Sequence, residues 1–458
     1  MQVSRRHLLV SGGALALLSA CGGGTSVSTP SGGLDPDLLP QPNPGYDAWV
    51  AAFRGRAAAR GISAGTLDAA FRGAGYLPGV VTRDRSQTEF TRTLEDYLAI
   101  AASEQKVSTG RAELRRNMAL LREIEGRYGV PPEVVTAVWG MESNYGTRRG
   151  DIPVVSATST LAYDGRRGEF FEAQLISALR ILERGDTTPS RLTGSWAGAM
   201  GHTQFIPTTY QDYAVDFRGD GRRDIWSEDP TDGLASTANY LSRSGWRRGE
   251  PWGLEVRLPA GFSAGLTGRG VRRSSSDWAA LGVTNANGGS LPGGTGSILA
   301  LSGVTGPAFL VFQNFNVILR YNNAEKYGVG VGHLSDRLAG GGPVRGTFPP
   351  DRYGFTIDER KELQALLNRA GYDVGTPDGV FGSKTEAGIR SYQARVGLAV
   401  TGEPSQALLQ QLRRGEGRGA GSADLEEPPE EELPDLRQRA VGRGVFFLFI
   451  PVRFRAGF

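Results

Sequence analysis

Apolar residues recur every three to four positions through most of residues 46–252, with polar residues between them. Side chains three and four positions apart lie on the same face of an α-helix, so this spacing indicates amphipathic helices. The same spacing returns over residues 315–338. We therefore predict a mainly helical region. Its clearest helical segments are residues 49–53, 90–101, 112–128 and 169–182.

Residues 253–306 break the helical pattern. They are rich in Gly and Ser and contain short apolar alternations at residues 254–258 and 297–301. Alternation with a period of two is typical of half-buried strands. We expect residues 46–341 to form one mainly α (α+β) domain, with a small β-containing insertion at residues 253–306.

The rest of the chain predicts a smaller module and a tail. A Gly-Gly-Pro segment beginning at Gly341 indicates a linker. Residues 353–414 then carry leucines at helical spacing, which indicates a compact helical module. Residues 415–458 begin Gly-rich and become strongly acidic, so we expect a disordered tail.

The N-terminus has the pattern of an export signal. Two arginines precede an apolar run over residues 8–20, which is too short to span a bilayer comfortably. Small residues lead into Cys21, the only cysteine, so residues 1–21 resemble a bacterial lipoprotein signal peptide with Cys21 as the lipidation site. A plain signal peptide with an incidental cysteine is the alternative. Residues 22–45, rich in Gly, Ser and Pro, predict a flexible linker.

Composition narrows the classes of function. The 458 residues are enough for two or three domains, and the net charge is only +3. A dedicated nucleic-acid binder usually carries a strong basic patch, so we expect no nucleic acid partner. The histidines, His7, His202 and His333, have no other His or Cys within metal-ligand spacing. A zinc hydrolase, a Cys–His nucleophile and a Ser–His–Asp triad therefore lack most of the residues that they need.

A carboxylate near the end of an apolar helix is the strongest catalytic candidate. Pro131 and Pro132 predict a helix start, because proline fits the first turn, where its missing N–H costs nothing. Glu142 then falls on the same face as Val135 and Val138. Burial there would raise the pKa of Glu142 and make it a proton donor near neutral pH. A structural Glu paired with an arginine or the backbone is the alternative.

Two longer segments carry a resemblance to a known family. Residues 138–146 read Val-Trp-Gly-Met-Glu-Ser-Asn-Tyr-Gly, and residues 195–210 read Ser-Trp-Ala-Gly-Ala-Met-Gly-His-Thr-Gln-Phe-Ile-Pro-Thr-Thr-Tyr. Both resemble the active-site segments of the membrane-bound lytic murein transglycosylase B family, and residues 84–90 and 320–323 fit the same pattern. The resemblance covers residues 46–338 and implies a lysozyme-like helical core with added α and β parts.

The resemblance implies a reaction on peptidoglycan. The family cuts the β-1,4 bond between N-acetylmuramic acid and N-acetylglucosamine with one carboxylate, which Glu142 matches. That residue would protonate the leaving oxygen and then accept a proton from the muramoyl 6-hydroxyl, which closes onto the anomeric carbon without water. The substrate-binding positions implied by the resemblance are Ser195, Gln204, Tyr240, Tyr321, Asn322 and Tyr327.

The residues of this cleft also have ordinary structural interpretations. Ser195 could be a helix N-cap, Gln204 a surface amide, and the tyrosines core residues. The small residues Gly198 and Gly201 would let a substrate approach the backbone, or would serve close packing, or both. His202 has no second His or Cys nearby, so we interpret it as part of the pocket wall rather than as a base.

Residues 216–227 resemble an EF-hand calcium loop with two departures. Arg218 stands at loop position 3, where its cation opposes a metal, and Ser227 replaces the usual Glu at position 12. Arg218 could instead bridge the two aspartates of the loop. We expect no required cofactor, while structural calcium and an empty turn both stay open. The candidate metal ligands, the last of them implied by the resemblance, are Asp216, Asp220, the carbonyl of Arg222, and Asp232.

Residues 353–414 resemble the peptidoglycan-binding type 1 domain, a three-helix bundle. The resemblance rests on Leu363-Gln-Ala-Leu-Leu367, on the turns Gly371-Tyr-Asp-Val-Gly375 and Asp378-Gly-Val-Phe-Gly382, and on the residues after them. Gly388 departs from the family, whose helix usually has a better helix former there. We expect it to cost about 0.5–1 kcal/mol of local helix stability.

Three functions remain open at this stage. The main one is a lytic transglycosylase that binds peptidoglycan glycan strands, with other wall enzymes as possible partners. A hydrolytic muramidase would use Glu142 with water, and a non-catalytic scaffold would bind peptidoglycan through the C-terminal module alone. A lipid on Cys21 would anchor the protein to a membrane facing the periplasm. Gly22, in place of Asp after the cysteine, points by resemblance to the outer membrane of a Gram-negative bacterium.

Overall fold

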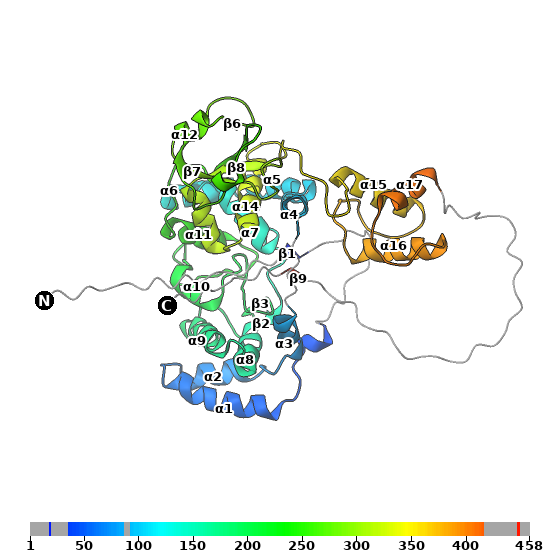
Figure 1. Ribbon diagram of the computed structural model, residues 1–458. Helices are drawn as coiled ribbons and strands as arrows, with labels where there is room; N and C mark the ends of the chain where they lie inside the picture. The colour runs from blue at the N-terminus through cyan, green and yellow to red at the C-terminus, as the bar shows by residue number, and fades with distance from the viewer. Residues whose placement is uncertain (1–17, 20–34, 87–91, 416–446, 449–458) are drawn as a thin grey trace, which may run out of the picture. The chain divides into compact units, whose positions relative to one another are not determined.

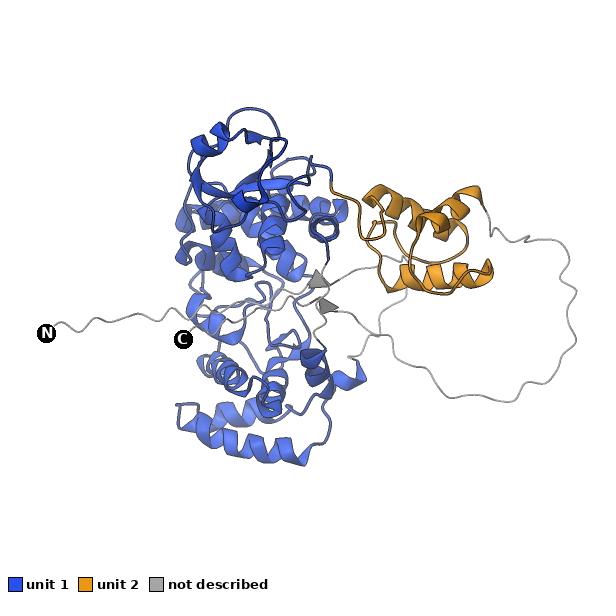
Figure 2. Cartoon of the chain, viewed as in Figure 1, with its two compact units in different colours: residues 1–18, 29–347, 449–458 blue, residues 19–28, 348–448 orange. Residues whose placement is uncertain are grey.

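The chain forms two compact units, which divide between Thr347 and Phe348 (Figure 1; Figure 2). Most of the described residues are helical, and the five-stranded sheet lies in the first unit. The predicted mainly helical fold is confirmed. The computed structural model describes residues 18–19, 35–86, 92–415 and 447–448.

Several predictions concern residues outside this part of the chain. Cys21 lies outside the described residues, as does most of the predicted signal peptide. Residues 416–446 and 449–458 of the predicted tail are also not described. Within the described residues, no helix is both long enough and apolar enough to cross a lipid bilayer.

The first unit contains two groups of packed helices, and one group surrounds a helix that is buried along almost its whole length. Its helices are α1 (Pro44–Ala58), α2 (Ala64–Phe71), α3 (Pro78–Arg85), α4 (Leu94–Ala101), α5 (Glu104–Arg116), α6 (Met118–Tyr128), α7 (Pro132–Ser143), α8 (Val154–Asp164), α9 (Gly168–Arg184), α10 (Pro207–Tyr213), α11 (Thr231–Arg243), α12 (Ser275–Ala280), α13 (Gln313–Tyr321) and α14 (Glu325–Leu338), with the 3-10 turns η1 (Pro36–Leu38) and η2 (Ala264–Leu266). Its strands are β2 (Ile152–Pro153), β3 (Thr193–Gly194), β4 (Gly253–Arg257), β5 (Arg273–Ser274), β6 (Thr284–Asn285), β7 (Thr295–Leu299) and β8 (Ala308–Val311), and near the chain ends lie the two-residue strands β1 (Leu18–Ser19) and β9 (Phe447–Leu448).

Helix α7 is this buried helix. It packs against α5, α6, α11 and α14 (Figure 1). Every residue from Val134 to Ser143 is buried, because apolar or small side chains surround almost the whole helix. The prolines predicted to open the helix do so, with Pro132 as its first residue. Burial on all sides fixes the polar residue near its end, Glu142, among the side chains of its neighbours.

Two segments with a predicted helical pattern are each divided at an asparagine. The predicted helix 112–128 is split between α5 and α6 at Asn117, whose side-chain amide donates 2.9 Å to the Glu113 carbonyl. The helical pattern over residues 315–338 is divided between α13 and α14, with Asn322 in an extended conformation. Asparagine side chains compete with the backbone for hydrogen bonds, which favours a helix end at these positions.

The predicted β-containing insertion is an antiparallel sheet. Its five strands lie in the order β5-β7-β8-β4-β6. The predicted strands at residues 254–258 and 297–301 correspond to β4 and β7. Strand β8 lies beyond the predicted boundary at residue 306, because its four residues are all buried and show no alternation. Trp278 fills the core under this sheet and donates its indole N–H 3.1 Å to the Gly296 carbonyl.

The second unit is the predicted three-helix module, formed by α15 (Ile357–Arg369), α16 (Ser383–Arg395) and α17 (Gln406–Arg414). Two buried glutamines hold its turns. The Gln364 side-chain oxygen accepts from the Gly379 N–H at 2.8 Å, and that of Gln393 accepts from the Gly402 N–H at 2.8 Å. The core consists of Phe355, Leu363, Leu367, Val374, Ile389, Tyr392, Leu408, Leu409 and Leu412.

Gly388 on α16 has a packing reason that the sequence did not reveal. A Cβ added there would lie 2.4 Å from the Cγ1 of Val374, which is closer than real Cβ atoms come to a neighbour. The glycine therefore lets α16 approach the segment before it closely. Its cost in helix propensity is offset by packing.

Candidate active site

Glu142 lies near the end of α7, two residues before the chain leaves the helix in a left-handed turn. Asn144 and Tyr145 follow with φ values of 48° and 58°, which are unfavourable for residues other than glycine. Packing holds this exit in place. The Tyr145 hydroxyl donates 2.9 Å to the Lys106 carbonyl on α5, and its ring fills the space where Gly140 has no side chain. The strained exit is thus fixed by contacts of α7 with α5.

The two oxygens of the Glu142 carboxyl have different surroundings. Oε1 accepts a hydrogen bond of 2.6 Å from the Tyr327 hydroxyl. Oε2 is buried and has no hydrogen-bond partner among the described residues. The residue is 2% exposed. Burial raises the pKa of Glu142 to about 8, against the smaller lowering effects of Tyr327 and Lys106. At neutral pH the group is therefore a carboxylic acid with one uncommitted oxygen.

Four phenols feel the charge of this carboxyl, and each comes from a different helix or helix end. Burial raises the pKa of Tyr97, Tyr240, Tyr321 and Tyr327, and the charge of Glu142 adds to the rise in each case. All four stay neutral at physiological pH. A flat apolar face joined to a hydroxyl is the combination that suits a sugar ring.

These tyrosines are fixed from behind by the backbone. The Tyr321 hydroxyl donates 2.7 Å to the Thr203 carbonyl, and that of Tyr240 donates 2.6 Å to the Arg320 carbonyl. Phe205 packs against both rings, with centroids 5.7 Å away in each case. The phenol of Tyr97, in contrast, is buried and has no hydrogen-bond partner among the described residues. The structure thus brings three predicted site residues, Tyr240, Tyr321 and Tyr327, into electrostatic reach of Glu142.

Ser195 caps a turn rather than a helix. Its Oγ accepts from the backbone N–H groups of Ala197 and Ala199 at 3.3 and 3.1 Å. Both lone pairs of the hydroxyl are then used, so the hydroxyl can offer a ligand only its proton. The alternative interpretation of Ser195 as a helix N-cap is wrong, since residues 195–206 are turns and bridges.

Gln204 is buried, not a surface amide. Its backbone has a φ of 50°, and its side-chain nitrogen donates to the carbonyls of Gly201 at 2.9 Å and Arg149 at 3.1 Å. Only the amide oxygen is left for a ligand. Thr203, the residue before Gln204, accepts the hydrogen bond from the Tyr321 hydroxyl. Asn322 is 3% exposed at the break between α13 and α14.

The small residues of this segment serve packing. A Cβ on Gly201 would lie 2.1 Å from the Ile225 carbonyl oxygen, and one on Gly198 would lie 2.9 Å from Thr158. His202 braces α7. Its Nδ1 accepts from the Trp139 indole N–H at 3.0 Å, and its Nε2 lies 2.8 Å from the Ser227 carbonyl oxygen. Burial lowers the pKa of His202, so the ring is neutral and committed at both nitrogens, as expected for a pocket wall.

The acidic turn is held by its own hydrogen bonds. Asp216 accepts from the N–H groups of Gly219, Asp220 and Gly221 at 2.6–3.1 Å. The two oxygens of Asp232 accept from the backbone on both sides of the turn. The suggested Arg218 bridge between the aspartates is wrong, because Arg218 pairs with Glu123 at 2.6 Å.

The fit of this turn to calcium is poor. Among the described residues there is no group of three or more acidic, His or Cys side chains arranged to hold a metal. The Ser227 carbonyl, at the last loop position, accepts from Arg149 at 2.9 Å. Desolvation raises the pKa of Asp232 to about 6, and the charges of Asp216 and Asp220 add smaller rises.

Two residues near Glu142 escaped sequence reasoning. Tyr97 lies on α4, and Gly330 of α14 makes room for it, since a Cβ there would lie 2.7 Å from the tyrosine ring. Lys106 on α5 donates from its Nζ 2.9 Å to the Gly140 carbonyl of α7. Neither residue stands in a segment that carried the family resemblance. Only the packing of α4 and α5 onto α7 and α14 places them near Glu142.

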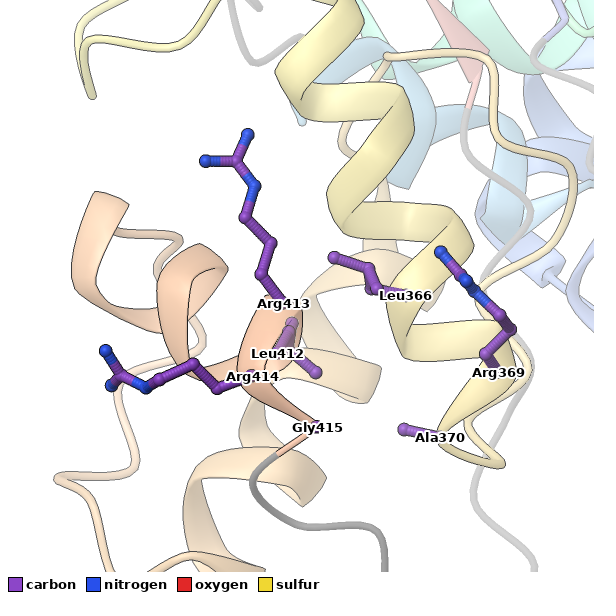
Figure 3. Close-up of a pocket in the computed structure, with 7 residues that line it drawn as sticks. All are labelled: Leu366, Arg369, Ala370, Leu412, Arg413, Arg414 and Gly415. Atoms are coloured by element: carbon purple, nitrogen blue, oxygen red, sulfur yellow. The ribbon is translucent and has the colours of Figure 1, made fainter.

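The second unit has a shallow pocket between the ends of α15 and α17 (Figure 3). Leu366, Ala370 and Leu412 form its floor, and arginines from the last turns of both helices stand at its rim. Cations in the last turn of a helix complement the helix dipole. One of them, Arg413, is engaged in a two-bond pair with Glu362 at 2.9 and 2.7 Å. The basic rim therefore has a structural explanation.

Comparison with known proteins assigns both units. Residues 45–336 match the family described as "Transglycosylase SLT domain", and residues 356–412 match "Putative peptidoglycan binding domain". The chain is similar to the structure of SltB3 from Pseudomonas aeruginosa in complex with NAG-NAM-pentapeptide. The identity is 48%, the match covers 81% of this chain and 100% of that chain, and the TM-score is 0.66.

Two relatives from Escherichia coli are more distant. The structure of the lytic transglycosylase Slt35 in complex with calcium is 28% identical, covers 65% of this chain and 93% of that chain, and has a TM-score of 0.55. The membrane-bound lytic murein transglycosylase B of strain K12 is 36% identical over 222 residues, which are 46% of this chain. The chain spans 58% of the length of that relative. The predicted family resemblance is confirmed, since the first match covers well over half of the 458 residues. The chain belongs to the transglycosylase SLT domain family.

Proposed function

We propose that this protein is a lytic transglycosylase that cleaves the β-1,4 bond between N-acetylmuramic acid and N-acetylglucosamine in peptidoglycan. The observation that carries the proposal is a single buried acid. Glu142 is protonated at neutral pH, and the groups that shift its pKa are a phenol and a lysine. No second carboxylate among the described residues contributes to that shift. Glycosidases that use water or a protein nucleophile generally need two carboxyl groups.

The first step is proton donation from Glu142. Tyr327 holds Oε1 at 2.6 Å, so the proton resides on Oε2, the oxygen without a protein partner. Oε2 gives this proton to the glycosidic oxygen, while the bond between the anomeric carbon and that oxygen breaks and its electron pair goes to the oxygen. The buried surroundings keep the acid neutral until a leaving group is present to take the proton.

In the second step the substrate supplies its own nucleophile. The 6-hydroxyl of the muramoyl residue bonds to the anomeric carbon, and its proton returns to Glu142. The product is a 1,6-anhydromuramoyl end, and no water is consumed. The neutral phenols of Tyr97, Tyr240 and Tyr321 can support the sugar during this step without competing as bases, because their pKa values lie above the ordinary range. The Ser195 hydroxyl proton and the Gln204 amide oxygen are available for hydrogen bonds to sugar groups.

The second unit would hold the enzyme on its polymeric substrate. The supporting observation is its match to a peptidoglycan-binding family over residues 356–412. We also propose that lipid on Cys21 anchors the protein in the periplasm, at the outer membrane. Replacement of Cys21 by Ala should move the mature protein from the membrane fraction to the soluble fraction.

Product analysis tests the reaction. Protein lacking residues 1–21 is incubated with purified murein, beside the Glu142→Gln variant, and the released fragments are analysed by mass. Anhydromuramoyl ends from the first protein and none from the variant are expected. Reducing muramic ends would instead identify a hydrolytic muramidase. Binding to murein without any release by either protein would identify a non-catalytic scaffold.

A further inference from the structure

Lys106 lies on α5 where this helix crosses the end of α7. Its Nζ donates 2.9 Å to the carbonyl oxygen of Gly140, two residues before Glu142. The N–H groups of Asn144 and Tyr145 both turn to the Trp139 carbonyl, which leaves the Gly140 carbonyl to the lysine. A cation at this position complements the negative end of α7.

The lysine is held at this place from both its ends. Its own carbonyl accepts from the Tyr145 hydroxyl at 2.9 Å. The Tyr145 ring in turn lies against Gly110 on α5 and Gly140 on α7, where an added Cβ would lie 2.2 and 2.5 Å from tyrosine atoms. Neither helix can shift without breaking this arrangement. The ammonium group is therefore a fixed charge rather than a mobile surface one.

Lys106 differs in charge from the other groups that face Glu142. Tyr97 from α4, Tyr240 from α11, Tyr321 from α13 and Tyr327 from α14 are neutral phenols. Helix α6 also packs on α7 but contributes no group with a described effect on the carboxyl. Burial lowers the pKa of Lys106 to about 8, and the charge of Glu142 acts against this lowering. The reciprocal effect, from Lys106 on Glu142, favours the ionised carboxyl.

We propose that Lys106 is a positioning residue whose fixed ammonium stabilises the Glu142 carboxylate that is left after proton donation. A carboxylate formed in a buried pocket of phenols would otherwise have no opposite charge near it. The lysine thus makes the acid easier to ionise when the leaving oxygen takes the proton. This inference rests on the proposed function for its place in the reaction. The effect of the Lys106 charge on the pKa of Glu142 does not depend on that function.

The decisive variant is Lys106→Met in the full mature protein. It is compared with the wild type by the pH dependence of kcat/KM for murein cleavage. The acid form of Glu142 is needed, so activity falls as pH rises through its pKa. Loss of an opposite charge raises that pKa, and the falling limb should move upward by about one pH unit. The kcat at neutral pH should fall by up to about 10-fold, because one pH unit in the pKa is a tenfold change in the stability of the conjugate base.

Arg111→Met is the matched control. Arg111 lies on the same helix and also donates to the last turn of a neighbouring helix, the Arg337 carbonyl of α14, at 3.0 and 2.6 Å. It has no described effect on the pKa of Glu142. Both variants should lower the melting temperature, but only Lys106→Met should move the pH profile. Lys106→Arg, which retains the charge, should keep the wild-type limb.

The pKa of Glu142 can also be read without turnover, from the carboxyl carbon signal in a nuclear magnetic resonance titration, assigned with Glu142→Gln. If the wild type gave no anhydromuramoyl products but Lys106→Met still raised this pKa, the proposed function would fail and the pairing would stand. Lys106→Gln removes the charge but keeps a donor, and it serves if the Met variant does not fold. An unchanged pKa and an unchanged profile in the folded variants would overturn the inference.

Discussion

At the residue scale, the chemistry depends on the difference between the two oxygens of one carboxyl. Tyr327 occupies Oε1, and Oε2 faces no protein donor among the described residues. A hydrogen bond from a phenol favours the ionised form of the acid, while burial favours the neutral form, and burial is the larger effect. The group is thus held protonated, with its proton directed to one oxygen. Tyr327 thereby determines which atom gives up the proton.

Replacing Tyr327 by Phe should reduce kcat for murein cleavage by about 10-fold or more, because Oε1 loses its donor and the acid is no longer oriented. The free energy of unfolding should fall by about 1 kcal/mol for the lost buried hydrogen bond. Tyr210→Phe is the control, since its buried hydroxyl donates to the Arg223 carbonyl at 2.6 Å away from the predicted site. Equal kcat losses in both variants would contradict a role for Tyr327 at the carboxyl.

The raised pKa of Glu142 also predicts how stability depends on pH. The folded protein holds a proton on this group up to about pH 8, whereas the ordinary value is 4.5. Between these values the folded state binds more protons than the unfolded state, so stability is lost as pH rises. Glu142→Gln cannot ionise and escapes this loss. Its melting temperature relative to wild type should therefore rise steadily from pH 4.5 to pH 8. A difference that stays constant over this range would show that the pKa is not raised.

At the element scale, the sequence predicted the type of most elements but not where they break. Periodicity identified α9 and the strands β4 and β7, because apolar residues recur at a regular spacing in their sequences. Periodicity did not show the breaks between α5 and α6 or between α13 and α14. The hydrophobic spacing continues across Asn117 and Asn322, whereas the helical backbone ends there. Glu142 could be predicted because it stands in a motif, and Tyr327 because it matches a cleft position implied by the family resemblance. Lys106 and Tyr97 could not, because only the packing of separate helices brings them to the carboxyl.

Gly388 supplies a test of packing against helix propensity. Gly388→Ala should destabilise the second unit by about 1–3 kcal/mol, because the new methyl group meets Val374 in a filled space. The matched control is Gly126→Ala on α6, where an added Cβ meets nothing within 4 Å. That variant should be stabilised by about 0.5–1 kcal/mol through helix propensity alone. Thermal unfolding followed by circular dichroism measures both changes, and stabilisation of the Gly388 variant would show that α16 can move away.

The turn at residues 216–227 should not need calcium. Its aspartates already accept backbone hydrogen bonds, and Arg218 is directed to Glu123. We expect the melting temperature to be the same in excess chelator and in millimolar calcium. A ligand that binds only the folded state raises the melting temperature with its concentration. A rise that depends on calcium concentration would therefore show that the turn rearranges to hold the ion.

At the scale of the whole molecule, the residues proposed to cleave the glycan strand and the module proposed to bind peptidoglycan lie in different units. Every group that faces Glu142 belongs to the first unit, and the second unit has its own closed core of apolar residues. The end of the first unit is secured without the second. Glu255 on β4 accepts from the N–H groups of Arg345 and Gly346 at 2.6–3.0 Å, just before the division at Thr347. Each unit therefore has the contacts that it needs to fold by itself.

This separation predicts the effect of ending the chain after Thr347. The shortened protein keeps the Glu255 contacts and the complete surroundings of Glu142, so it should melt as a folded unit and retain kcat on short soluble glycan fragments. On insoluble murein its activity should fall at low enzyme concentration, because one of two linked binding events is lost and with it the gain in effective concentration. Sedimentation with murein measures the binding directly. Equal sedimentation of the full and shortened proteins would place the wall-binding surface in the first unit, and loss of activity on soluble fragments would show that the second unit takes part in cleavage.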